Sequence, residues 1–68
     1  MNNWQKVFSD ELLYRAEIVK AVLEDHYIGA VILNKKDTSY HWGTHEVMVA
    51  PDDILKAIII IKEEINFE

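Results

Sequence analysis

Apolar residues near the start of the chain first alternate with polar ones and then recur at helical spacing. Residues Trp4–Phe8 combine tryptophan, valine and phenylalanine with two polar residues in an imperfect alternation, which predicts a short strand. From Glu11 to His26 the apolar residues recur at steps of four and three, which predicts a helix. Its apolar face consists of Leu12, Ala16, Val19 and Leu23, widened by Leu13, Ile18 and Val22. Either Ser9 or Asp10 is expected to cap this helix at its start.

The middle of the chain has the pattern of a strand that is apolar on both faces. Residues Ile28–Asn34 form this expected strand. Its two faces are Ile28, Ala30 and Ile32 on one side and Val31 and Leu33 on the other. The polar segment Lys35–Gly43 is expected to be a loop, and Thr44–Val49 a third strand. In that third strand Val47 and Val49 share one face, and Glu46 and Met48 share the other. A loop of this length is compatible with a hairpin between the two strands.

The last third of the chain predicts a second helix. Pro51 suits the first helical position, and Asp52 and Asp53 follow it in the first turn, where negative charge is favourable. The apolar stripe of this helix is predicted to be Ile54, Ile58, Ile61 and Ile65. The tail from Ile65 to Phe67 is expected either to form a short extra strand or to pack as coil.

Together these elements predict an α+β fold in the order strand, helix, strand, strand, helix (βαββα), in a single domain spanning residues 1–68. A strand–helix–strand unit forms a right-handed crossover between parallel strands, and the third strand fits between them. The expected three-stranded sheet therefore has the order 2-3-1, a mixture of parallel and antiparallel strand directions, and both helices on one face. This arrangement is most of a ferredoxin-like split unit.

Two helices leave the other face of the predicted sheet open to solvent. Trp4 and Phe8 are expected to point away from Val7, and the second strand is apolar on both sides. Large apolar side chains should therefore remain on the open face. Monomers rarely expose more than roughly a few hundred Å² of contiguous apolar surface, so we expect this face to contact a second copy of the chain or another protein. The alternative is that Trp4 lies over the end of the sheet and the other apolar side chains are scattered.

Composition and charge narrow the functional classes. The 68 residues include 12 acidic residues, 7 basic residues and no cysteine, for a net charge of −5. This balance disfavours nucleic-acid binding, which needs clustered positive charge, and Lys35 and Lys36 are the only adjacent cations. No apolar stretch approaches the roughly 20 residues that span a bilayer, and the N-terminus lacks the pattern of a secretion signal. The absence of cysteine fits a reducing cytoplasm, which is the expected location.

The polar segment between the second and third strands carries much of the side-chain chemistry of the chain. Its candidate ligand-binding or partner-binding residues are Asn34, Lys35, Lys36, Asp37, Ser39, Tyr40, Trp42 and Gly43. The lysines could hold an anion or nucleotide with Ser39 and Tyr40, and Trp42 could stack on a ligand or cover the sheet edge. Asn34 and Gly43 are expected to shape the turn. The competing interpretation is a solvated hairpin in which polar residues only cap turns.

No catalytic or metal-binding constellation follows from the sequence. Ser39, His41 and Asp37 lie close together along the chain, but a triad needs rigid support that a single loop does not supply. His41, His45 and Glu46 do not have a spacing typical of a metal site. With 2 glycines, phosphate-loop and dinucleotide motifs cannot be built. We therefore expect a protein that is not an enzyme and that needs no metal or cofactor.

Several segments together resemble a known family. They are Val22-Leu23-Glu24-Asp25 at a helix end, Ile28-Gly29-Ala30-Val31, the run from Leu33 to Tyr40, Gly43, and Glu46-Val47-Met48-Val49-Ala50-Pro51. From Trp4 to about Lys62 the chain is similar to the prokaryotic signal-transducing protein family, whose fold is similar to that of the nitrogen-regulatory PII proteins. The resemblance implies a ferredoxin-like fold and a bacterial cytoplasmic setting, without an established activity. The long nucleotide-binding loop and second half of PII proteins have no counterpart here, so trimerisation and ATP binding are not implied.

One residue departs from what the first predicted helix needs at its end. A glycine would end that helix most easily, because it adopts a left-handed conformation without strain. The chain has Tyr27 there. Either Tyr27 adopts that conformation or the chain turns differently.

These observations lead to two functional hypotheses. The leading one is a non-enzymatic regulatory or protein-interaction module that binds a partner through the open sheet face, with the segment from Asn34 to Gly43 adding a contact. The alternative is a small-metabolite or nucleotide sensor that binds its ligand at the same segment.

Overall fold

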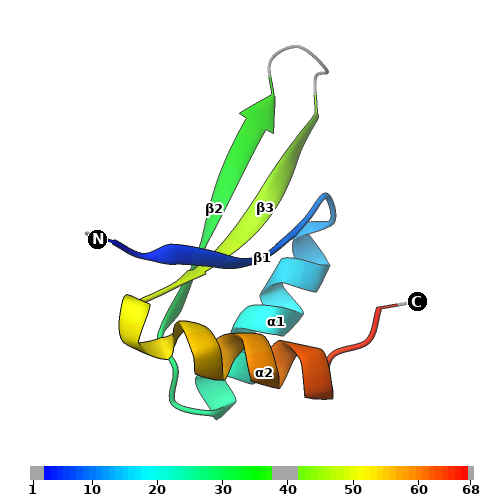
Figure 1. The fold of residues 1–68 in the computed structure, drawn as a ribbon. Coiled ribbons are helices and arrows are strands. Elements are labelled where there is room, and N and C mark those ends of the chain that lie inside the picture. The colour runs from blue at the N-terminus through cyan, green and yellow to red at the C-terminus, as the bar shows by residue number, and fades with distance from the viewer. Residues whose placement is uncertain (1–2, 38–41, 68) are drawn as a thin grey trace.

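The computed structural model describes residues 3–37 and 42–67, which form a small sheet packed against two helices (Figure 1). In chain order the elements are β1 (Gln5–Asp10), α1 (Leu13–Asp25), β2 (Ala30–Asp37), β3 (Trp42–Val49), a 3₁₀ turn (Pro51–Asp53) and α2 (Ile54–Glu64). The predicted α+β fold and its βαββα order are confirmed.

The sheet has β3 at its centre. β3 pairs antiparallel with both β1 and β2, so the order is β1-β3-β2. This is the predicted order 2-3-1 read from the opposite edge. The outer strands run in the same direction, as the crossover through α1 requires, but every pair of neighbouring strands is antiparallel. Among the described residues, β1 and β2 are the two edges of the sheet.

One face of the sheet is buried beneath the helices. Ala30 pairs with Val49 and Ile32 pairs with Val47, so these four residues share a face. The buried core joins this face to both helices and consists of Ala16, Val19, Leu23, Ile28, Ala30, Val47, Val49 and Ala57. The predicted faces of the second and third strands and the placement of both helices on one side are therefore correct.

An irregularity in β1 changes which of its side chains reach the core. Lys6 pairs with Met48 and Phe8 pairs with the next residue of β3, Val47. Val7 therefore has no partner in the ladder and forms a β-bulge. Val7 and Phe8 both pack against the core. The expectation that Phe8 points away from Val7 is wrong, because the inserted residue interrupts the alternation of the strand.

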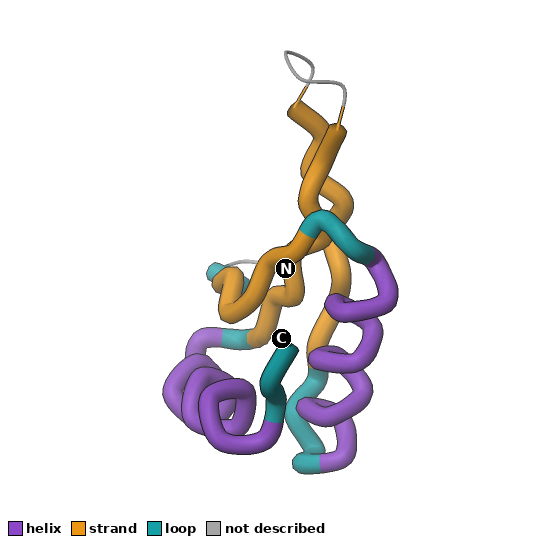
Figure 2. The backbone as a smooth tube through the Cα atoms, turned by 90° about the vertical axis from the view of Figure 1, so that its right-hand side faces the viewer, coloured by secondary structure: helices purple, strands orange, loops and turns teal. Residues whose placement is uncertain are grey.

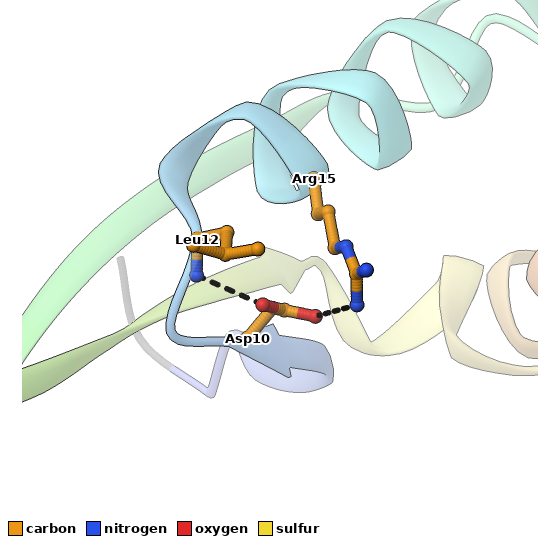
Figure 3. A network of polar contacts seen from close by, with 3 residues as sticks. All are labelled: Asp10, Leu12 and Arg15. Atoms are coloured by element: carbon orange, nitrogen blue, oxygen red, sulfur yellow. Dashed lines mark hydrogen bonds and ion pairs between the residues drawn. The ribbon is translucent and has the colours of Figure 1, made fainter. Parts of the chain in front are cut away.

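Asp10 organises the junction between β1 and α1 (Figure 3). One of its carboxylate oxygens accepts a hydrogen bond from the backbone N–H of Leu12 at 2.8 Å, and the other lies 3.3 Å from Arg15 Nη1. The hydrogen bond from Leu12 and, next, the contact with Arg15 hold the pKa of Asp10 below its ordinary value. β1 therefore extends to Asp10, and α1 begins at Leu13 rather than at Glu11. Leu12 occupies the N-cap position, so neither residue predicted to cap the helix does so.

α1 ends at a strained tyrosine. Tyr27 has a φ angle of 64° and is 98% exposed. The backbone N–H groups of Tyr27 and Ile28 donate to the carbonyl oxygens of Glu24 and Leu23, at 2.9 and 3.0 Å. This pairing, with buried Leu23 and Ile28 in the same cluster, is a Schellman motif. Tyr27 thus adopts the left-handed conformation for which glycine is the easier residue.

α2 buries a narrower face than its sequence predicts. Ala57 is fully buried, and Ile54, Ile60, Ile61 and Ile65 pack against the core. Ile58, which was predicted to belong to this face, is 45% exposed. The reason is that α2 packs on one side, mainly against β1 and α1. The four side chains of the run Ile58–Ile61 point in all directions around the helix axis. Covering one side cannot bury all four residues of the run.

The segment 65–67 is coil and not a further strand. The ring of Phe67 lies 5.8 Å from that of Phe8, and the guanidinium of Arg15 lies 5.1 Å from the Phe67 ring centroid. Such contacts are typical of aromatic pairs and cation–π pairs. The tail therefore packs against β1 and α1. Neither helix of the described residues has the length and apolar character needed to cross a membrane.

Candidate functional site

β2 and β3 continue beyond the body of the domain as a two-stranded ribbon. β1 pairs with β3 only as far as Asp10 opposite His45. The β2–β3 ladder runs three pairs further, from Lys35 and Thr44 to Asp37 and Trp42. Figures 1 and 2 show this ribbon projecting away from both helices. We call residues 34–37 and 42–45 the hairpin arm.

The arm corrects the prediction that Lys35–Gly43 is a loop. Residues 35–37 belong to β2, and residues 42 and 43 belong to β3. Asn34 and Gly43, which were predicted to shape a turn, lie within the ladder opposite His45 and Lys36. The pattern of the sequence did not indicate a strand here, because a ribbon exposed on both sides needs no apolar alternation.

The two lysines of the arm point in opposite directions. Lys35 and Lys36 are both exposed and are consecutive residues of β2, and successive side chains of a strand lie on opposite faces. Lys35 shares a face with its partner Thr44 and continues the open face, whereas Lys36 lies on the face that the helices cover further down. The two ammonium groups therefore do not converge on a small anion from this backbone.

Gly43 allows β2 and β3 to approach closely within the arm. A Cβ atom at position 43 would lie 2.5 Å from the carbonyl oxygen of Lys35 and 3.1 Å from Lys36 Cα. Both are backbone atoms, which cannot move aside as a side chain can. The φ angle of Gly43 is not positive, so glycine is required here for space and not for a turn.

Part of the predicted site lies outside the described residues. Ser39, Tyr40 and His41 are outside the described residues, so the grouping of Ser39 with His41 and Asp37 has no structural account. Asp37 and Trp42 form the last described pair of the ladder. The structure therefore brings together Asn34, Lys35, Lys36 and Gly43 on one ribbon, with Asp37 and Trp42 at its end.

The open face of the sheet carries apolar side chains that lead toward the arm. Val31 pairs with Met48, and Leu33 follows Val31 on the same face of β2. These three side chains are outside the buried core, and Leu33 is 37% exposed. Beside them, Lys6 Nζ of β1 lies 3.8 Å from Glu46 Oε2 of β3. The open face is therefore apolar as predicted, and the ion pair of Lys6 with Glu46 lies beside its apolar side chains.

Trp4 lies against the segment that leads into β2. A Cβ atom at Gly29 would lie 4.0 Å from Trp4 Cη2, an ordinary van der Waals distance. The indole of Trp4, which precedes β1, therefore reaches to the segment that precedes β2. This agrees with the alternative in which Trp4 covers the sheet end, and it leaves Val31, Leu33 and Met48 as the apolar part of the open face.

The potential metal ligands of the described residues do not gather at one place. His45 and Glu46 are consecutive in β3 and so point to opposite faces. His26 lies beside the ends of both helices, where its Nε2 is 2.7 Å from Glu64 Oε2. Across residues 3–37 and 42–67, no group of three or more potential ligands is arranged to hold a metal ion.

No protein-family model, curated protein or solved structure matches this chain. The fold and site define a small α+β domain with an open sheet face and a projecting hairpin arm. These two features are the parts of the described surface that differ most from a plain packed domain.

Proposed function

We propose that this protein is a non-enzymatic regulatory module that binds a partner protein through the hairpin arm and the adjoining open sheet face. The observation that carries the proposal is the length of the β2–β3 ladder, which continues three pairs beyond the last pair of β1 with β3. A two-stranded ribbon is marginally stable by itself, and no helix covers this one. Such an arm adds little to the stability of the core, so a role in contact with another molecule accounts for it better.

The chemistry of the surface suggests what the partner presents. Lys35 and Lys36 give the arm one cation on each of its two faces, in a chain whose net charge is −5, and Lys35 lies on the open face. On that face, Val31, Leu33 and Met48 form an apolar strip that leads to Lys35. A partner segment with carboxylates next to apolar side chains would match both features, since opposite charges guide the encounter and buried apolar area stabilises the complex.

The outer edge of β2 offers a second element of recognition. β2 is an edge strand of the described sheet, so its outward backbone groups are available to an added strand. Extended partner segments commonly bind in this way. Charged residues such as Lys35 and Lys36 also protect edges from indiscriminate pairing, so an acidic partner segment would be selected over a neutral one.

This proposal includes a signalling role in a bacterial cytoplasm, in line with the family that the sequence resembles. The small-metabolite or nucleotide sensor has less support. In that hypothesis the two lysines could hold an anion or nucleotide together, but consecutive strand positions direct Lys35 and Lys36 to opposite faces.

Site-specific photo-crosslinking in an extract of the cells that produce the protein tests the proposal. A photoreactive amino acid at Leu33 should capture a distinct protein partner, whereas the same group at Ile18, an exposed residue of α1, should not. Replacing Lys35 and Lys36 with glutamate should abolish the capture. Lys20→Glu with Lys56→Glu makes the same change in net charge elsewhere and should leave the capture intact.

The control variants decide between specific and general effects. Loss of capture with both pairs of charge reversals would show that only net charge matters and would contradict a site on the arm. Equal capture by the photoreactive group at Leu33 and at Ile18 would also contradict a site on the arm. A crosslinked species of twice the chain mass would identify the occupant of the sheet face as a second copy.

A further inference from the structure

The outer surface of α2 carries apolar side chains that the fold leaves uncovered. Leu55 is 75% exposed, Ile59 53% and Ile58 45%. Leu55 and Ile59 are four residues apart and so lie one above the other on the side of the helix away from buried Ala57. This surface is separate from the hairpin arm and from the open sheet face, because the helices cover the opposite side of the sheet.

Charges of opposite sign stand at the two ends of this apolar pair. Asp52 lies three residues before Leu55, in the 3₁₀ turn that leads into α2. Lys62 lies three residues after Ile59, in the last turn. Both are exposed, and the spacings of three, four and three residues keep all four side chains on one stripe of the helix. We call Asp52, Leu55, Ile59 and Lys62 the α2 stripe.

The α2 stripe is complementary to itself when two copies of the helix run in opposite directions. A two-fold axis can run between the two helices, perpendicular to them and level with residue 57. It brings Asp52 of one copy next to Lys62 of the other, and the same contact forms a second time by symmetry. Leu55 meets Ile59 of the second copy in the same way, again twice. An interface around a two-fold axis must match itself in this manner.

We propose that the α2 stripe is a homodimerisation surface on which α2 packs antiparallel against α2 of a second copy. A parallel arrangement would place Lys62 beside Lys62 and Asp52 beside Asp52, which repel each other. The antiparallel arrangement also opposes the two helix dipoles, which is favourable. Charge complementarity therefore selects both the occupant and its direction.

The size of the contact predicts a weak dimer. One helix from each copy, with three exposed apolar side chains, covers much less than the roughly 1,200–2,000 Å² of a standard interface. Such small contacts barely offset the entropy lost on association. We expect a dissociation constant on the order of 10–100 µM, so that the dimer forms at high local concentration.

Sedimentation of charge-reversed variants tests the arrangement. Asp52→Lys and Lys62→Asp should each weaken self-association about tenfold, because each places like charges in both end contacts. An equimolar mixture of the two variants should form a heterodimer at least as well as the wild type, because both end contacts are then attractive. The double variant Asp52→Lys with Lys62→Asp should also recover self-association. Melting curves of all variants at low concentration check that they fold.

Apolar variants complete the test. Leu55→Lys should abolish self-association without unfolding the domain, since Leu55 is 75% exposed. Ile18→Lys, at a 42% exposed position of α1, should leave it unchanged. A wild-type chain that remains monomeric up to about 1 mM, well above the expected range for a weak interface, overturns the proposal. A dimer that persists unchanged in both single charge variants also overturns it. Failure of the equimolar mixture of the two variants to dimerise overturns it as well.

Discussion

Replacing Gly43 with alanine tests the close approach of β2 and β3 in the hairpin arm. The added Cβ would meet three backbone atoms of β2: the carbonyl oxygen of Lys35 at 2.5 Å, Lys36 Cα at 3.1 Å and the carbonyl carbon of Lys35 at 3.2 Å. The strands must separate locally to admit it. Loss of one or two ladder hydrogen bonds, at about 0.5–1.5 kcal/mol each, destabilises the arm by about 1–3 kcal/mol.

This loss should be local, because the arm lies beyond the buried core. A free-energy change of about 1–3 kcal/mol corresponds to a roughly 5- to 150-fold increase in the opening of the arm. Native-state hydrogen exchange should therefore accelerate by this factor at amides of residues 34–36 and 43–45. Amides of Val47 and Val49, which are fully buried, should change much less.

Gly29→Ala is the matched control for this prediction. A Cβ at position 29 meets only the side chain of Trp4, at 4.0 Å, and neither glycine has a positive φ angle. Alanine there should be neutral or stabilising by up to about 1 kcal/mol, since it restricts the unfolded chain. If Gly43→Ala leaves exchange in the arm as slow as Gly29→Ala does, the inference of a close backbone approach is wrong.

Three further predictions concern the body of the domain. Tyr27→Gly should raise the free energy of unfolding in urea by about 1 kcal/mol, because glycine adopts the left-handed conformation without strain; no gain over Tyr27→Ala would refute this. The lowered pKa of Asp10 means that its stabilisation is complete above the ordinary value of 3.8 and is lost as pH falls through the folded value. Asp10→Asn should therefore flatten the acid limb of stability measured by urea unfolding between about pH 2 and 5. Leu23→Ala should cost about 2–5 kcal/mol, because Leu23 is fully buried, and a thermal shift no larger than that of Leu13→Ala, at a 46% exposed position, would contradict it.

The periodicity of the sequence predicted the helices and strands well where one side of an element is buried. Ala16, Val19 and Leu23 recur at helical spacing and are all fully buried in α1. Val47 and Val49 are two residues apart and are fully buried in β3, whereas Glu46 and Met48 on the other face lie outside the buried core. The pattern predicts such residues because burial of one face selects apolar side chains at the period of that element.

Periodicity does not indicate the structure where burial does not constrain the sequence. Lys35 and Lys36 lie in β2 but were assigned to a loop, because both sides of the arm face solvent and no apolar alternation is required. In α2, four consecutive isoleucines fit any face of the helix, so periodicity could not show that Ile58 is half exposed. The candidate binding residues Lys35, Lys36 and Gly43 therefore lie on strands and not on the expected loop.

The sequence by itself determined the order of the elements and the buried faces of α1, β2 and β3. These are local properties, since they follow from side-chain spacing and backbone preference within a few residues. Only the tertiary structure decided the extra residue at Val7, the length of the hairpin arm and the exposure of the α2 stripe. Each of these depends on which distant segment packs against the residue, and that information is not contained in the local pattern of apolar and polar positions.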